Sequence, residues 1–284
     1  MGIQSSQRLS LKVLIGKAIG SLINKYDGRV GHWQPDVGSI EISDVHLPLP
    51  RLAPEFEGYR LVQISDIHLG TWMNKAGLDI VVDKVNQLNP DLVAITGDFV
   101  SFAAEDFTHD LVGALRKLTP KDACVAILGN HDYWTNPHII RWALKESAIY
   151  DLSNDVFSLQ RQGAFLHLVG IDDFLINLDK LGRVLDQLPD DGAAILLAHE
   201  QDFADISAAS RRFDLQLSGH THGGQIVLPG FGRLILPSRG QKYPSGRYLI
   251  NGMILYTNRG LGTTWLRFRY NCPPEISLFT LHSR

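Results

Sequence analysis

The sequence contains little cysteine and no long hydrophobic run. Its two cysteines, Cys124 and Cys272, exclude both a disulfide framework and a structural zinc site built from cysteine. No stretch reaches the roughly 18 uninterrupted apolar residues of a membrane-spanning helix. Neither charge predominates, because 27 basic and 30 acidic residues give a formal net charge of −3. This balance carries no signature of nucleic-acid binding, and we predict none.

The composition is that of a folded chain with a large core. Hydrophobic residues make up 44% of its 284 residues, which argues against wholesale disorder. Short apolar runs alternate with segments of helical spacing, and this alternation predicts an α/β fold with largely parallel pairing. We expect strands at 40–47, 60–65, 92–96, 124–128, 195–198 and 214–218, helices at 74–88 and 110–118, and a hairpin over 157–170.

The first 39 residues form a separate unit in our interpretation, with the main domain spanning residues 40–284. Apolar residues between Leu11 and Ile23 recur at helical spacing, and residues 1–26 carry four basic side chains and no acid. Such a basic amphipathic helix binds an anionic membrane surface, or it packs its apolar stripe on its own domain. The low cysteine content fits a reducing compartment, so we predict a cytoplasmic protein, with the inner face of the membrane as the alternative location.

Polar residues follow five of the predicted buried strands, each at the point where the strand ends. Because the carboxyl ends of parallel strands meet at one edge of a sheet, these side chains should converge there. Four imidazoles, two carboxylates and an amide exceed what one ion takes, whereas two ions roughly 3.5–4 Å apart that share a carboxylate would use them all. The predicted ligands are Asp66, His68, Asp98, Asn130, His199, His220 and His222.

The same blocks resemble the calcineurin-like metallophosphoesterase superfamily. Its pattern of D-x-H, G-D, G-N-H-[DE], H and G-H-x-H is present here in that order, between Asp66 and His222. The resemblance implies a four-layer fold, in which two stacked mixed sheets are flanked by helices and the metals lie at the strand ends.

The resemblance also implies a role for each site residue. Asp66, His68 and His222 would hold the first ion, and Asn130, His199 and His220 would hold the second, with Asp98 bridging the two. His131 would face the scissile phosphate as a catalytic residue, and Asp132 would orient it. Imidazole and carboxylate ligands suit manganese, iron, zinc or cobalt, and we favour manganese.

Two departures from the motifs of known branches indicate which branch of the superfamily the chain resembles. Purple acid phosphatases have a tyrosine where this chain has Ser101, and Phe99 to Phe102 replaces the block that follows the aspartate in protein serine/threonine phosphatases. The remaining motifs look like a bacterial phosphodiesterase-like branch, in a wider group that includes UDP-diacylglucosamine hydrolases. We therefore expect hydrolysis of a phosphodiester or pyrophosphate, lipid-linked or nucleotide-linked, by a metal-bridging hydroxide. A phosphomonoesterase and a non-catalytic scaffold are the alternatives.

The segment from Leu215 to Pro274 is basic throughout. It contains seven arginine or lysine residues and no acid, so it would attract the anionic phosphoester substrate. Arginine grips phosphate through two parallel hydrogen bonds, and we predict Arg259, in a glycine-rich loop, as a substrate-binding residue. Aromatic residues in the same segment would either line the substrate site or belong to the core; they are Tyr243, Tyr248, Tyr256, Trp265, Phe268 and Tyr270.

Overall fold

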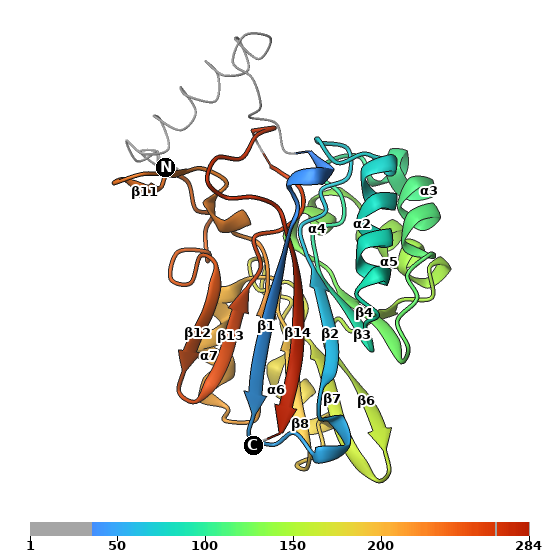
Figure 1. The fold of residues 1–284 in the computed structure, drawn as a ribbon, viewed down its shortest axis with the longest axis vertical. Helices are drawn as coiled ribbons and strands as arrows, with labels where there is room; N and C mark the ends of the chain where they lie inside the picture. Colours follow the sequence, from blue (N-terminus) through green and yellow to red (C-terminus); the bar gives the residue numbers. More distant parts are fainter. Residues whose placement is uncertain (1–35, 265, 284) are drawn as a thin grey trace, which may run out of the picture.

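The computed structural model describes residues 36–264 and 266–283, which form two six-stranded mixed sheets (Figure 1). The first sheet has the order β1 (Glu41–Leu49), β14 (Glu275–Ser283), β2 (Tyr59–Ile64), β3 (Leu92–Thr96), β4 (Ala123–Ile127) and β5 (Tyr150–Asp151). The second has the order β12 (Gly246–Ile250), β13 (Met253–Thr257), β9 (Leu215–Ser218), β8 (Ala193–Leu197), β7 (Ala164–Gly170) and β6 (Asp155–Arg161). Within each sheet the central strands run parallel.

The two sheets pack face to face, and their strands are buried on both sides. Successive side chains of a strand point to opposite faces, so Leu92 and Ala94 of β3 join the core between the sheets. Val93 and Ile95 of the same strand point the other way, toward the helices. Two-sided burial explains why these strands read as continuous apolar runs rather than as alternating ones.

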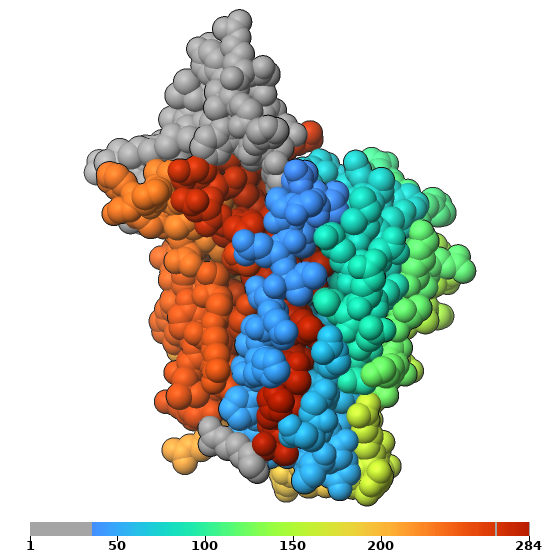
Figure 2. Space-filling view, in the orientation of Figure 1, coloured from blue at the N-terminus to red at the C-terminus, as the bar shows by residue number. Residues whose placement is uncertain are grey.

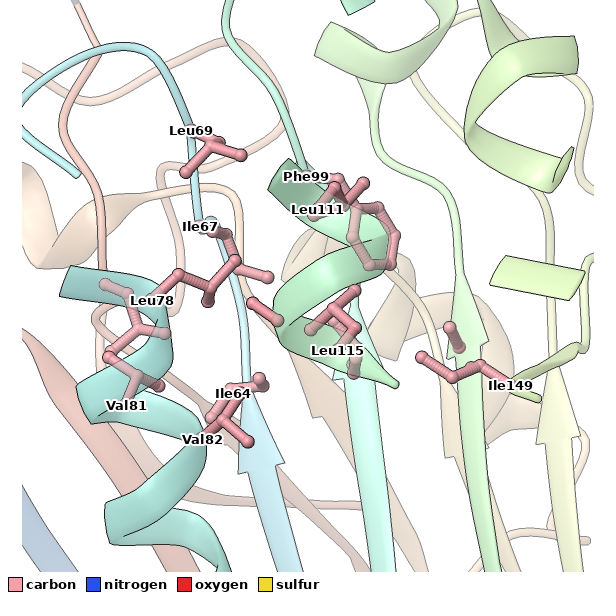
Figure 3. Packing of buried hydrophobic residues seen from close by; sticks show 14 of the residues in the cluster. Ile64, Ile67, Leu69, Leu78, Val81, Val82, Phe99, Leu111, Leu115 and Ile149 are labelled. Carbon is pink, nitrogen blue, oxygen red and sulfur yellow. The ribbon is translucent and has the colours of Figure 1, made fainter. Parts of the chain in front are cut away.

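Helices cover both outer faces, which completes a sandwich of four layers. Helices α2 (Lys75–Gln87), α3 (Ala104–Leu115) and α5 (Pro137–Glu146) pack on the first sheet (Figures 1 and 3). In the close-up, Val82 of α2 lies beside Ile64 of β2. Helices α6 (Leu181–Gln187) and α7 (Ala204–Ala209) contribute to the core on the outer face of the second sheet. The short helix α4 (Asn130–Thr135) follows β4 directly.

The predicted α/β class and four-layer arrangement are confirmed, as are the strands and the helix at 74–88. Asn74 caps α2 by accepting a hydrogen bond from the Gly77 backbone at 2.9 Å. The predicted bounds of the next helix were wrong, because α3 begins at Ala104 and ends at Leu115. Ala103 precedes it with a left-handed backbone and no capping side chain, so no residue at this position marks the start of a helix.

The predicted N-terminal helix and connector lie almost wholly outside the described residues. Their boundary and their docking on lipid stay predictions. Among the residues that the structure describes, no helix has the length and apolar character needed to cross a bilayer. In the space-filling view, β1 and β14 lie side by side along the middle of the visible face (Figure 2).

The packing between the sheets predicts the stability of two leucine variants. Leu197 is fully buried between the sheets, whereas Leu249 on β12 is 72% exposed. We expect Leu197→Ala to lower the free energy of unfolding by about 2–5 kcal/mol through lost burial and a residual cavity. Leu249→Ala should change it by less than about 0.5 kcal/mol. Urea unfolding followed by circular dichroism measures both, and equal losses would contradict this packing.

Candidate metal centre

All seven predicted ligands lie at the carboxyl ends of strands, and both sheets contribute. Asp66 and His68 follow β2, Asp98 follows β3, and Asn130 begins α4 after β4. The second sheet supplies His199 after β8 and the pair His220 and His222 after β9. A buried amide joins the sheets just below the ligands, because Gln63 Nε2 donates to Ser218 O at 3.0 Å and to Thr96 Oγ1 at 2.9 Å.

One group of ligand atoms is already gathered tightly enough for an ion. One atom each from Asp66, His68, Asp98 and His222 lies within 4.8 Å of the others, and all four residues are buried. His222 Nε2 is 3.0 Å from His68 Nε2 and 3.3 Å from Asp66 Oδ1. Two ring nitrogens and two carboxylates at this spacing form a donor set that suits a divalent transition metal.

A second group lies on the other side of Asp98. Asn130 Oδ1 is buried without a hydrogen-bond partner, which is costly unless something else satisfies it. Asp98 Oδ2 lies 3.3 Å from His199 Nε2 and 3.4 Å from His68 Nε2, so one carboxylate oxygen faces both groups. His220 packs edge-on against His199, with ring centroids 5.1 Å apart. The residues therefore fit two ions that share Asp98.

The ligands occupy an unusual backbone conformation. Asp66, His68, Asp98, His220 and His222 all have φ between 47° and 71°, a region that non-glycine residues rarely adopt and that clusters at functional sites. The backbone at Gly219 also passes very close to Ser65, since a Cβ at position 219 would lie 2.0 Å from Ser65 Oγ. The strand ends thus turn sharply enough to aim consecutive side chains at one point.

Three of the imidazoles are fixed by partners that the sequence did not reveal. His68 Nδ1 lies 2.8 Å from Ser101 Oγ, and His199 Nδ1 lies 2.7 Å from Thr96 O. His220 differs, because its Nε2 contacts Ser238 O at 2.9 Å. In His68 and His199 this contact occupies Nδ1 and leaves Nε2 facing Asp98, as is usual for metal-binding histidines. These partners lie 33, 103 and 18 residues from their histidines in the sequence, so no local pattern could reveal them.

The buried Arg269 holds together the loops behind the centre. Its guanidinium donates to the carbonyls of Arg259, Gly260 and Gly262 and lies 3.3 Å from His222 Nδ1. The pKa of His222 is well below its usual value because of burial, His68 and this guanidinium. Burial likewise lowers the pKa of His220. Both rings are therefore neutral near pH 7, which is the form that binds metal.

Asp98 is ionised in spite of its burial. Desolvation opposes its charge, but His199 and His131 outweigh that effect and place its pKa well below the usual value. In return, Asp98 raises the pKa of His199 well above normal, against the effect of burial. A cation that binds at Asp98 would replace the proton on His199, so binding should release protons to the solvent.

His131 lies at the centre without joining either group. Its ring meets His68 edge-on, with centroids 4.7 Å apart, and it lines the adjacent cavity. The ring is hydrogen-bonded to the backbone of Ser101, and burial lowers its pKa.

Asp132 does not take the expected position beside the His131 ring. Its carboxylate accepts from the backbone N–H groups of Asp98 at 2.9 Å, Phe99 at 2.9 Å and Gly129 at 3.0 Å. The prediction that it orients His131 is not supported by these contacts. Burial and the charge of Asp98 raise the pKa of Asp132 to about 8, against the effect of the amides. It fixes the loops that carry Asp98 and Asn130.

Several basic side chains of the segment after β9 form ion pairs or hydrogen bonds with other parts of the protein. Arg259 was the predicted substrate contact, but its Nε lies 2.9 Å from Glu275 Oε2 and its Nη2 lies 2.9 Å from Glu41 Oε2. These ion pairs argue against substrate binding. Arg239 donates to the Phe174 carbonyl, and Lys242 pairs with Asp205.

The aromatic residues of this segment belong largely to the core. Tyr256 packs between the sheets, and Phe268 belongs to a small separate core. Tyr243 and Tyr248 pack on the core beyond the second sheet. Trp265 lies outside the described residues.

A cavity of about 320 Å³ opens directly above the ligands. Asp98, Asn130, His131, His220 and His222 form its polar part. The opposite wall is apolar and comes from the segments that follow the last histidine: Ile226, Ile235, Leu236, Pro237 and Leu266. The cavity therefore combines a charged floor with a hydrophobic side.

Comparison with known proteins agrees with this site. The profile of the calcineurin-like phosphoesterase family matches residues 59–224, the segment that holds every predicted ligand. The chain belongs to the calcineurin-like phosphoesterase family and is a metal-dependent phosphoester hydrolase.

Three relatives span most of the chain. An uncharacterized metallophosphoesterase of Bacillus subtilis, YkuE, is 35% identical over 80% of both chains. Phosphodiesterase YaeI of Escherichia coli is 27% identical over 78% of this chain and 82% of its own. UDP-2,3-diacylglucosamine pyrophosphatase LpxG of Chlamydia muridarum is 27% identical over 87% of this chain and 90% of its own. Two other relatives are longer, and the chain spans 57% and 64% of their lengths.

Because the ligands come from both sheets, metal should stabilise the fold. At a 100-fold excess of Mn²⁺ over its dissociation constant, we expect about 2.7 kcal/mol of stabilisation, measured as a rise in Tm by calorimetry. Asp132→Asn should reduce this rise, because an amide NH₂ would face backbone N–H donors. Asp44→Asn, an exposed change on β1, is the matched control. An identical rise in both variants would show that Asp132 does not support the centre.

Proposed function

We propose that the protein hydrolyses a phosphodiester or pyrophosphate at two divalent metal ions, with manganese as the favoured metal. The observation that carries this proposal is the position of Asp98, whose Oδ2 lies within 3.4 Å of ring nitrogens from both ligand groups. Asp66, His68 and His222 would hold one ion, and Asn130, His199 and His220 the other. When bound, the ions lower the pKa of water and offset negative charge on the phosphoryl oxygens.

The chain's own residues would position the substrate and handle the proton. The contact between His131 and the Ser101 backbone favours the protonated ring, while burial opposes it. An anionic phosphate beside His131 would also favour the protonated ring and so raise the pKa of His131. The protonated ring could then donate to the leaving oxygen, or hydrogen-bond to a phosphoryl oxygen. Arg259 has no role in this mechanism, because its guanidinium pairs with Glu275 and Glu41.

Two variants distinguish metal binding from proton transfer. Asp98→Ala should lose bound manganese and lower the hydrolysis of bis(p-nitrophenyl) phosphate by at least about 100-fold. His131→Asn should keep its manganese and lose about 10²–10⁴-fold in kcat. His138→Asn on α5 is exposed and serves as the matched control. Metal content by mass spectrometry and initial rates give both readouts. Full activity of the Asp98 variant would rule out the proposal.

The phosphomonoesterase is the alternative activity. Rates on bis(p-nitrophenyl) phosphate and p-nitrophenyl phosphate at equal manganese concentration separate the two. A higher kcat/KM for the monoester would favour the alternative. A non-catalytic scaffold would require a protein that binds no metal.

The apolar wall of the cavity supports a lipid-linked substrate. A cavity of about 320 Å³ whose floor holds the ligands and whose side is built from Ile226, Ile235 and Leu236 suits a phosphate attached to an acyl chain. The pyrophosphatase LpxG acts on UDP-2,3-diacylglucosamine, a substrate that is both acylated and nucleotide-linked. We propose a substrate of this chemical class.

The apolar wall predicts a specific effect on KM. Ile235→Ser should raise KM for an acylated diester by about 10- to 100-fold, because side-chain burial of this size contributes roughly 1.5–3 kcal/mol. A short aryl diester without acyl chains should be affected much less. Ile206→Ser, an exposed change on α7, is the matched control. Equal effects of Ile235→Ser on both substrates would contradict an acyl-binding role.

A further inference from the structure

We propose that the hairpin formed by β10 (Val227–Leu228) and β11 (Gly232–Arg233) inserts its tip into the surface of a lipid membrane. The tip comprises residues 229–232, whose sequence Pro-Gly-Phe-Gly carries no charge. Phe231 is 78% exposed, the highest value among the large exposed hydrophobic side chains of the described residues. This proposal concerns binding and goes beyond the hydrolysis proposed above.

The exposure of Phe231 does not come from a loosely attached loop. Ile226, Leu234, Leu266 and Phe268 form a separate hydrophobic core at the base of the hairpin. Val227 N donates to Tyr270 O at 2.9 Å, which ties β10 to the neighbouring segment. The tip is also closed, since Phe231 N donates to Leu228 O at 3.1 Å. A firmly based hairpin therefore holds an aromatic ring outward.

The hairpin is continuous with the wall of the cavity. Ile226 directly precedes β10, and Ile235 to Pro237 follow β11 closely; all of them line the cavity above the ligands. In Figure 1, β11 lies at the upper end of the molecule, the end at which the strands of the first sheet deliver their ligands. A membrane that receives Phe231 would thus lie beside the apolar wall.

Charge favours an anionic bilayer as the occupant. Residues 215–274 contain no acid, but Arg259 and Lys242 pair with acids of other segments. Among the described residues, Arg233 of β11 hydrogen-bonds only to neutral partners, Gly223 O and Ser245 Oγ, so its positive charge is not offset there. Arg267, between the core residues Leu266 and Phe268, is exposed and forms no ion pair with any residue that the structure describes. An aromatic ring beside free basic charge is the combination that binds membrane interfaces. The surface of a four-residue tip is far smaller than the roughly 800 Å² that each partner buries in a stable protein complex. A bilayer is therefore a better occupant for this tip than a protein.

The native cysteines allow a direct test of insertion. Cys124 and Cys272 are both buried, so a single new cysteine can be labelled selectively with the environment-sensitive dye NBD. We choose Phe231→Cys and the matched control Leu249→Cys, since Leu249 on β12 is 72% exposed. Both full-length variants are mixed with vesicles of equal parts phosphatidylcholine and phosphatidylglycerol. We expect a severalfold, blue-shifted rise in NBD emission at position 231 and none at position 249.

Other outcomes would overturn the proposal. No change at position 231, or the same change at both positions, means that the tip does not enter the bilayer. An emission change without vesicles that grows with protein concentration would assign the tip to a second copy of the chain. Phe231→Ser should also lower cosedimentation with the vesicles severalfold. It should leave the hydrolysis of the soluble aryl diester unchanged, so a failure of the proposed hydrolysis would be seen separately.

Discussion

The centre depends on one buried carboxylate, Asp98, that remains ionised. A charge removed from water is costly unless other charges or hydrogen bonds compensate it. Here His199 and His131 provide the compensation, and the His131 backbone donates to Asp98 Oδ1 at 2.9 Å. The same carboxylate contacts ligands from both sheets. The distance between the sheets, the turns after β3 and β4, and the uptake of cations are therefore coupled at a single side chain.

The convergence of the ligands could be predicted from the sequence because it follows from parallel strands alone. Each motif stands directly after a short apolar run, and topology brings those positions to one edge. The four-layer architecture followed from the resemblance. The supporting contacts were not predictable in this way. Two of the three amides that Asp132 holds, those of Asp98 and Phe99, lie 34 and 33 residues away in the sequence, so no local pattern marks these contacts.

The roles of the arginines also could not be predicted from the sequence. A basic segment without acids suggests phosphate binding, but Glu275, one residue beyond it, pairs with Arg259. Arg269 instead compensates carbonyl groups of the loops behind the centre. The segment contributes an apolar wall to the cavity. Shape and hydrophobicity would therefore select the substrate, whereas the sequence suggested that charge would. Short helices such as α4 and α7 were missed because six residues show too little periodicity.

The order of strands in the first sheet has a consequence for biosynthesis. β14 lies between β1 and β2, parallel to the former and antiparallel to the latter, yet more than 200 residues separate it from both. While the chain is being synthesised, the edges of β1 and β2 stay without their common neighbour, and unpaired strand edges invite aggregation. The first sheet closes only after residues 275–283 have left the ribosome, so until then these two edges stay open to pairing with other chains.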